Sequence, residues 1–353
     1  MTPLGRLRRL TPSTTALDGT ARRLAPCEGS PAALHRLRTV QRRRMGTSGL
    51  QVSRLGLGTM SWGEDADADS AAAQLTAFVE AGGTLVETAD GYGGGAAQDI
   101  LGKLLAQTVH RGDLVLAGRA VLAIGAHGDG ASRGALLAGL DAMLRRLGTD
   151  HLDLWQIPGW DPDVPLDETL SAAQTAVASG RVRYVGLVGP TGWQLATVVE
   201  RARAAASAAV PVSSQAEYSL LERGAEIALL PAAAYHGVGL LAWAPLGRGV
   251  LTGKYAGGVP ADSRGASPTR APYVEARRGE HSARIVQAVI TAADGLSTSP
   301  LAVALAWVRD RPGVAVAVVG ARDAAQLAAS MAAEAVTLPA AIRSALDDVS
   351  EQP

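Results

Sequence analysis

The stretch TLVETADGYGGGAAQDILGK, residues 84–103, decides how the rest of the chain is interpreted. It predicts a short apolar strand, a turn that carries Glu87 and Tyr92, a run of three glycines, and an amphipathic helix. The carboxylate and the phenol therefore lie at the C-terminal end of a strand. In α/β proteins built on parallel strands, that end carries the chemistry.

Outward from this stretch, short apolar strands alternate with helical patterns. The predicted strands are 55–58, 84–87, 113–118, 152–157, 182–188, 211–215, 238–243 and 314–319. The predicted helices are 67–81, 95–108, 131–147, 166–179, 191–207, 224–236, 281–308 and 338–350. This alternation indicates parallel β-α-β units, and eight strands favour a closed (β/α)8 TIM barrel over an open doubly wound sheet.

Two segments depart from the alternation. Thr47-Ser48-Gly49 lies between two short strands and predicts an N-terminal β-hairpin. Residues 247–280 are rich in Gly, Pro and Ser and follow the seventh strand. An irregular loop of that length is usually a functional lid or a mobile segment.

Residues 1–40 differ in character from the rest and predict a disordered, Arg-rich extension to a single domain over residues 41–353. Residues 1–44 hold ten arginines and two acids, a net charge of +8, which leaves −8 for the remainder of a neutral chain. We expect a tail with no role in the fold. A transit peptide and a nucleic-acid-binding or membrane-binding arm are the alternatives.

Composition narrows the function classes. The acidic body argues against a nucleic-acid partner, and no run approaches the roughly 18 apolar residues of a membrane span. The single Cys27 rules out an internal disulfide and favours a reducing, cytoplasmic location. No His/Cys spacing predicts a metal site, and no G-x-S-x-G elbow is present. Nothing in the sequence sets the oligomeric state.

Several segments together carry a resemblance to a known family. They are LGLGTMSWG from residue 55, the 84–103 stretch, LDLWQI from 152, QAEYSLLER from 215, WAPLGRGVLTGKY from 243 and VVGARDAAQL from 318. In this order they resemble the aldo-keto reductase superfamily over about residues 41–350. The resemblance implies a (β/α)8 barrel that transfers hydride from NADPH to a small-molecule carbonyl.

The resemblance also implies catalytic residues, and three of the four positions are altered. Tyr92 matches the proton-donating tyrosine. Glu87 stands where the family has aspartate, and its extra methylene moves the carboxylate by ~1.5 Å. Arg119, in DLVLAGR, replaces a lysine with a larger cation that cannot exchange a proton near neutral pH. Pro158, in DLWQIP, replaces a histidine and offers no side-chain donor.

The implied cofactor site likewise contains some positions that match the family and some that differ from it. The expected ligands are Gln215 for the nicotinamide carboxamide, Tyr218 for the ring, Arg248 and Lys254 for the pyrophosphate, and Arg322 and Gln326 for the adenosine phosphate. Arg322 is placed to meet a 2′-phosphate, which favours NADPH over NADH. Where the family usually has Ser-Asn and Glu-Asn, this chain has Val188-Gly189 and Ala329-Ser330.

Three hypotheses remain open at the level of sequence. The first is a divergent NADPH-dependent oxidoreductase, in which Tyr92 is the general acid, Arg119 its supporting cation and Glu87 the partner of that cation. The second is a catalytically inactive barrel with a degenerate tetrad that acts as a cofactor sensor or a regulatory or assembly subunit. The third is different chemistry that uses the same three residues as an acid–base set.

Overall fold

The computed structural model describes residues 40–120, 130–261, 263–268 and 270–351. The chain divides into two units, Met1–Leu37 and Arg38–Pro353, and the description below concerns the second. The predicted disordered extension, up to residue 39, lies outside the described residues.

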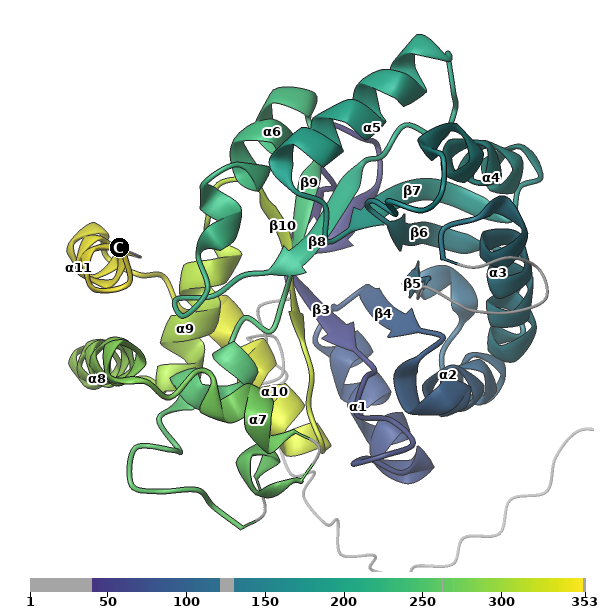
Figure 1. Ribbon diagram of the computed structural model, residues 1–353. Helices are drawn as coiled ribbons and strands as arrows, with labels where there is room; N and C mark the ends of the chain where they lie inside the picture. Colours follow the sequence, from purple (N-terminus) through teal and green to yellow (C-terminus); the bar gives the residue numbers. More distant parts are fainter. Residues whose placement is uncertain (1–39, 121–129, 262, 269, 352–353) are drawn as a thin grey trace, which may run out of the picture. The chain divides into compact units, whose positions relative to one another are not determined.

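Eight parallel strands close into a barrel, as predicted (Figure 1). Their order around the barrel follows the chain, with β10 closing against β3. They are β3 (Leu55–Gly58), β4 (Leu85–Ala89), β5 (Val115–Arg119), β6 (Leu152–Pro158), β7 (Val182–Val188), β8 (Ser213–Glu217), β9 (Gly239–Trp243) and β10 (Val314–Val319). All strands point the same way, so their C-terminal ends share one face, where a barrel carries its functional groups.

Helices surround the barrel (Figure 1). They are α1 (Ala68–Glu80), α2 (Ala96–Gln107), α3 (Arg133–Leu147), α4 (Leu166–Ala178), α5 (Gly192–Ala204), α6 (Leu229–His236), α7 (Ala271–Glu275), α8 (Glu280–Gly295), α9 (Pro300–Arg309), α10 (Ala324–Ala332) and α11 (Ala340–Val349). Side-chain caps set several of the starts. Thr191 and Gln194, for example, form a reciprocal capping box that begins α5.

A hairpin closes the N-terminal end of the barrel, as predicted. It pairs β1 (Arg42–Arg44) with β2 (Gln51–Ser53). Met45 and Val52 from the hairpin pack with Leu85, Leu154 and other inward-facing strand residues in an apolar cluster inside the barrel. The N-terminal half of the interior is therefore filled with apolar side chains, which confines the polar interior groups described below to the C-terminal half.

The prediction of one helix over residues 281–308 is wrong, because the chain forms α8 and α9 there with a bend of 102° between them. Ser297 takes a left-handed conformation (φ 50°), Ser299 caps α9 through the backbone N–H of Ala302, and Pro300 occupies the first helical position. Within the described residues no single helix is both long and apolar enough to cross a membrane. Helices α8 and α9 reach the required length and apolar character only when they are counted together as one bent pair.

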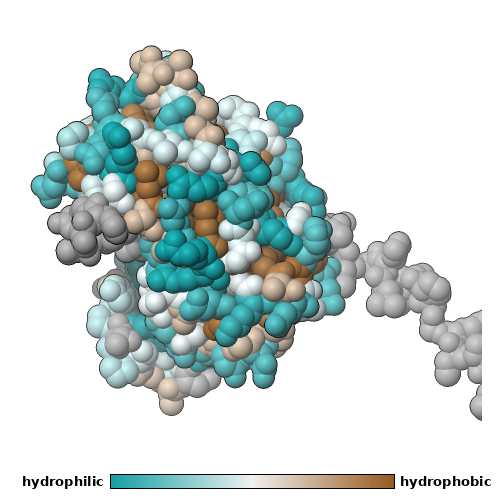
Figure 2. Space-filling model, turned by 90° about the vertical axis from the view of Figure 1, so that its right-hand side faces the viewer, coloured by the Kyte–Doolittle hydropathy of each residue, from teal (hydrophilic) through white to brown (hydrophobic). Residues whose placement is uncertain are grey.

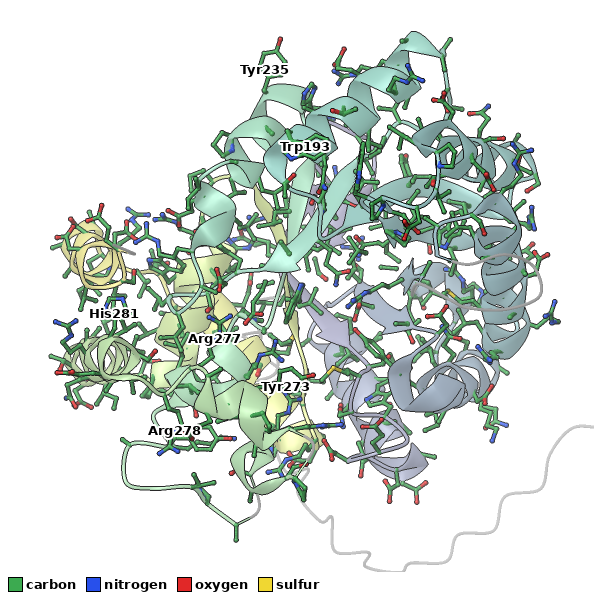
Figure 3. The ribbon with its side chains drawn as sticks, viewed as in Figure 1. Trp193, Tyr235, Tyr273, Arg277, Arg278 and His281 are labelled. Atoms are coloured by element: carbon green, nitrogen blue, oxygen red, sulfur yellow. The ribbon has the colours of Figure 1, made fainter. Side chains whose placement is uncertain are left out.

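The segment 247–280 is more ordered than its composition suggested. It contains two short 3-10 turns, η5 (Gly247–Thr252) and η6 (Arg264–Ala266), and helix α7. Ion pairs fasten it at two places. Arg270 pairs with Glu64 and Asp65 in the loop after β3. Arg277, labelled in Figure 3, pairs with Glu217, which ends β8, and with Glu222 in the loop that follows.

The outer surface is mixed in polarity. Figure 2 shows the face on the right of Figure 1, where polar side chains cover most of the area and apolar ones lie in small patches among them. The exposed large apolar residues among those described include Trp193, Tyr235 and Tyr273.

Candidate active site at the C-terminal ends of the strands

The structure brings Glu87 and Tyr92 together, as their positions in sequence suggested. Strand β4 carries the Glu87 side chain to a site where the residue is only 2% exposed. Gly93, Gly94 and Gly95 then adopt φ values of 56°, 63° and 103°, a left-handed path that glycine permits. This turn places the Tyr92 hydroxyl 3.0 Å from Oε1 and 3.3 Å from Oε2 of Glu87, so the phenol donates a hydrogen bond to the carboxylate.

Two glutamines extend this contact into a buried chain of hydrogen bonds. Gln215, from β8, donates its Nε2 to Glu87 Oε1 at 3.2 Å. Gln156, from β6, donates its Nε2 to Gln215 Oε1 at 3.0 Å. The Gln215 amide is thus held at both ends. Sequence reasoning named Gln215 and missed Gln156, although a polar residue inside the apolar strand LDLWQI was an available signal.

Arg119 ends β5 beside this chain, in register with Ala89 of β4 and Gln156 of β6. In the described part of the chain its Nε is buried and has no hydrogen-bond partner. Its effect on Glu87 is through its charge. Pro158 ends the neighbouring strand β6 and contributes no side-chain donor.

Burial sets the protonation of the pair. It raises the pKa of the Glu87 carboxyl above its ordinary value, and the charge of Arg119 opposes that shift only in part. Burial also raises the pKa of Tyr92, and the negative charge of Glu87 raises it further against the opposing charge of Arg119. Tyr92 is therefore a protonated phenol throughout the neutral range, and Glu87 keeps its proton to a higher pH than an exposed glutamate.

A second group of charges lies where β10 ends. Arg264, from the 247–280 segment, reaches the backbone of Gly320, where a Cβ built on that glycine would lie 3.7 Å from its Nη2. Burial lowers the pKa of Arg264, as do the charges of Arg270 and Arg322, while Asp65 opposes them. Three guanidinium groups thus share this corner. Sequence reasoning named Arg322 and missed Arg264, which stands in a segment without periodicity.

The remaining expected cofactor ligands have the following places. Gln326 accepts a hydrogen bond from the Arg322 backbone N–H at 3.3 Å, in the first turn of α10. The Lys254 ammonium lies 5.1 Å from the centre of the Tyr255 ring. Arg248 donates to Glu217 Oε2 at 3.2 Å and is thus already engaged within the protein.

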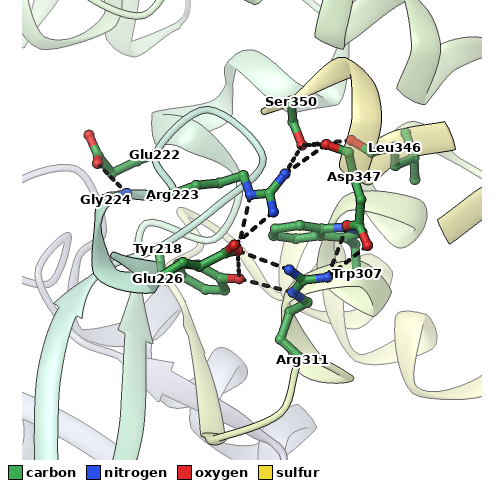
Figure 4. Close-up of polar contacts among 10 residues, drawn as sticks. All are labelled: Tyr218, Glu222, Arg223, Gly224, Glu226, Trp307, Arg311, Leu346, Asp347 and Ser350. Atoms are coloured by element: carbon green, nitrogen blue, oxygen red, sulfur yellow. Dashed lines mark hydrogen bonds and ion pairs between the residues drawn. The ribbon is translucent and has the colours of Figure 1, made fainter. Parts of the chain in front are cut away.

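Tyr218 lies apart from the Glu87–Tyr92 pair, in a cluster that joins the loop after β8 to α9 and α11 (Figure 4). Its ring stacks on Trp307 with a centroid separation of 5.6 Å. Its hydroxyl donates to Glu226 and accepts from Arg311 Nε. The ring is fully buried, so in this arrangement no face of it is open to a ligand.

Fold and site together define a (β/α)8 barrel with an acid–base group at the C-terminal ends of its strands. The chain matches the model of the Aldo/keto reductase family over residues 54–351, and it belongs to that family. This confirms the resemblance seen in the sequence. Among the described residues, no group of three or more His, Cys, Asp or Glu side chains is arranged to hold a metal ion.

Curated relatives agree with this assignment. The chain is 33% identical over 320 residues to "Uncharacterized oxidoreductase YrpG" of Bacillus subtilis, covering 88% of this chain and 95% of the relative. It is 31% identical to "Probable voltage-gated potassium channel subunit beta" of Oryza sativa, covering 83% and 91%. It is 35% identical over 234 residues to "L-glyceraldehyde 3-phosphate reductase" of Escherichia coli, covering 64% and 67%. The family and its named relatives place the chain among oxidoreductase homologues.

Proposed function

We propose that this protein is an NADPH-dependent oxidoreductase that reduces a small-molecule carbonyl to an alcohol with altered proton-transfer machinery. The observation that carries the proposal is the hydrogen bond from Tyr92 to the buried Glu87 carboxylate, at the face where a barrel performs its chemistry. Reduction of a carbonyl needs one acid near the carbonyl oxygen, and the phenol of Tyr92 is such an acid.

The cofactor, when bound, supplies the hydride that adds to the carbonyl carbon. Tyr92 gives its proton to the carbonyl oxygen, which becomes the alcohol. In the protonated form that its raised pKa favours, Glu87 then gives its own proton to the Tyr92 phenolate, which restores the phenol, and the Glu87 carboxylate takes a proton from solvent before the next turnover. Arg119 stabilises the negative charge that passes through the pair, by its own charge and without giving up a proton.

The raised pKa of Tyr92 gives the reaction a preferred direction. Reduction uses the protonated phenol, which is the form present at neutral pH. Alcohol oxidation needs the phenolate as a base, and that form is scarce until the pH is strongly alkaline. We therefore propose a reductase whose reverse reaction is slow under neutral conditions.

The residues present fit the phosphate part of NADPH better than its nicotinamide part. Arg264 and Arg322 supply two cations at the end of β10, with Gln326 beside them. Gln215, which would hold the carboxamide, has both ends of its amide engaged by Glu87 and Gln156. Binding would require it to exchange one of these partners. Cofactor affinity should therefore come chiefly from the phosphates.

A second candidate is a catalytically inactive barrel that senses the cofactor or serves as a regulatory or assembly subunit. The engaged amide of Gln215 and the proline that ends β6 both favour it. One relative carries the name of a probable channel subunit. For either function we propose a reducing compartment such as the cytoplasm, from the single cysteine.

Titration with NADPH and with NADH, followed by tryptophan fluorescence, tests the proposal. We expect micromolar NADPH binding, clearly tighter than NADH binding, and oxidation of NADPH in a screen of aldehydes and ketones. NADPH binding without turnover of any carbonyl would support the second candidate instead. Turnover of a substrate without cofactor would point to other acid–base chemistry at Tyr92, and no binding of either cofactor at millimolar concentration would overturn the proposal.

A further inference from the structure

The N-terminal end of the barrel, opposite the Glu87–Tyr92 pair, carries a hollow of about 480 Å³. It lies between the hairpin at β1, the C-terminal half of α6 with the start of β9, and the residues 310–315 that lead into β10 (Figure 1). A volume of this size is within the range of small-molecule sites. The described residues that line it do not include Glu87, Tyr92 or Arg119, so the proposed chemistry makes no use of it.

A β-bulge in β10 widens this end of the barrel. Val314 pairs with Leu240 and Val316 with Leu241, so Ala315 is an extra residue between two paired positions. Bulges of this kind are common at the rims of barrels and beside functional sites. Small and apolar side chains complete this part of the lining, namely Ala233 and Ala234 of α6, Val238 and Pro312. The hollow therefore has an apolar wall that suits the body of an organic molecule.

Two arginines at the hollow have no carboxylate of their own. Arg43 donates its Nη1 to the backbone oxygens of Arg309 at 3.0 Å and of Val314 at 2.7 Å, which holds the guanidinium in place without neutralising it. Arg44 is exposed. Among the described residues, no ion pair joins either side chain to an acid. The third arginine of the lining, Arg311, is engaged in the cluster of Figure 4.

The acids near Arg43 are already paired with other arginines. Asp310, which also lines the hollow, pairs with Arg54 at 3.4 Å and with Arg309 at 2.5 Å. Glu334 pairs with Arg54 at 2.5 Å. Burial, and next the charge of Arg54, lower the pKa of Arg43 to about 10, which is the effect of positive charge in excess. The hollow therefore lacks a negative charge that a ligand could supply.

We propose that this hollow binds a small organic oxyanion with an apolar body, such as an aromatic carboxylate or phosphate ester. Arg43 and Arg44 meet the oxyanion, because the planar guanidinium fork matches the oxygens of such groups. The wall that contains Ala234 and Pro312 removes the apolar body from water. The inference is independent of the proposed function, since the hollow and the Glu87–Tyr92 pair lie at opposite ends of the barrel.

Fluorine NMR of 4-fluorobenzoate, titrated with the full-length protein, tests the hollow. The uncharged match is 4-fluorobenzamide, and 4-fluorophenyl phosphate distinguishes phosphate esters from carboxylates. Arg43→Met and Arg44→Met remove the charges and keep the apolar stems. Ala234→Leu narrows the hollow without changing its charge. Arg42→Met is the matched control, because Arg42 is an exposed arginine of the same strand and does not line the hollow.

We expect saturable binding of at least one of the two anions and none of the amide. The affinity should fall by about tenfold in Arg43→Met and by about threefold in the more exposed Arg44→Met. Ala234→Leu should also weaken binding, and Arg42→Met should not. Circular dichroism verifies that each variant is folded. The proposal would be overturned by equal binding of the amide, by no saturable binding of either anion, or by a loss in Arg264→Met, at the other end of the barrel, in place of Arg44→Met.

Discussion

The hydroxyl of Tyr92 lies 3.0 Å from Oε1 of Glu87, so the acid of the site donates directly to a buried carboxylate. The family resemblance led us to expect this carboxylate to pair with the cation at position 119. Instead, Glu87 accepts hydrogen bonds from Tyr92 and Gln215, and Arg119 acts on this carboxylate through its charge. In this chain the carboxylate at position 87 is therefore a direct hydrogen-bond partner of the proposed proton donor, Tyr92.

The buried Glu87 should make stability depend on pH in a definite direction. Its folded pKa is raised, so the folded state binds this proton more tightly than the unfolded state does. Stability from this group is full below the unfolded pKa near 4.5 and is lost as the pH rises through the folded pKa. Glu87→Gln, which keeps an acceptor for Tyr92, should therefore melt at a higher temperature than the wild type at neutral pH.

Thermal unfolding over a range of pH tests that prediction. The difference between Glu87→Gln and the wild type should narrow as the pH falls toward 4.5, where the wild-type carboxyl is protonated. Glu80→Gln, at an exposed glutamate on α1, is the control and should show no such narrowing. A Glu87→Gln variant that is less stable than the wild type at neutral pH would contradict the raised pKa.

Restoring the shorter carboxylate and the smaller cation should make Tyr92 more acidic. In the double variant Glu87→Asp/Arg119→Lys, the carboxylate retreats from the phenol by ~1.5 Å and a compact ammonium replaces the guanidinium. The pH at which alcohol oxidation reaches half its maximum rate should then fall relative to the wild type. Steady-state oxidation with NADP+ across the alkaline range measures it, and an unchanged midpoint would show that Glu87 does not control the proton of Tyr92.

The sequence predicts the barrel, and it predicts that Glu87 and Tyr92 lie at the C-terminal end of the same strand, because both features are local. The alternation of strands and helices, and a strand–turn–helix stretch of twenty residues, lie within short windows. Long-range partners do not follow from such windows. Tyr218 meets Arg311, 93 positions away, and Gln156 meets Gln215, 59 positions away. These contacts depend on which strand ends the closed barrel brings together. The hydrogen bonds that link Gln156, Gln215 and Glu87 were therefore found only in the structure.

The charges at the end of β10 should discriminate between the two cofactors. Arg264→Met and Arg322→Met should each weaken NADPH binding by about tenfold, the effect of losing one charged hydrogen bond to the 2′-phosphate. NADH binding should change little. Fluorescence titration with both cofactors measures this, with Arg278→Met as the control. If the variants lost the same affinity for NADPH and for NADH, the two arginines would not be ligands of the 2′-phosphate.

The cluster of Figure 4 should anchor the C-terminal helix. Asp347 accepts hydrogen bonds from Trp307 Nε1 at 2.7 Å and from Arg311 Nη1 at 2.9 Å. Asp347→Ala strands both donors and should lower the free energy of unfolding by about 2–3 kcal/mol. Urea unfolding measures the loss, and the adjacent exposed Asp348→Ala is the control. Equal stability of the two variants would mean that the cluster contributes nothing to the attachment of α11.

The rate of NADPH oxidation by Tyr92→Phe, with the best carbonyl substrate from the screen, tests the central claim most directly. If Tyr92 is the proton donor, kcat/KM should fall by roughly 10²–10⁴-fold while NADPH binding stays unchanged. Tyr235→Phe, at a tyrosine 86% exposed on α6, should keep wild-type activity. A Tyr92→Phe variant that binds NADPH and turns over at the wild-type rate would contradict the assignment of Tyr92 and of the Glu87 pair that supports it.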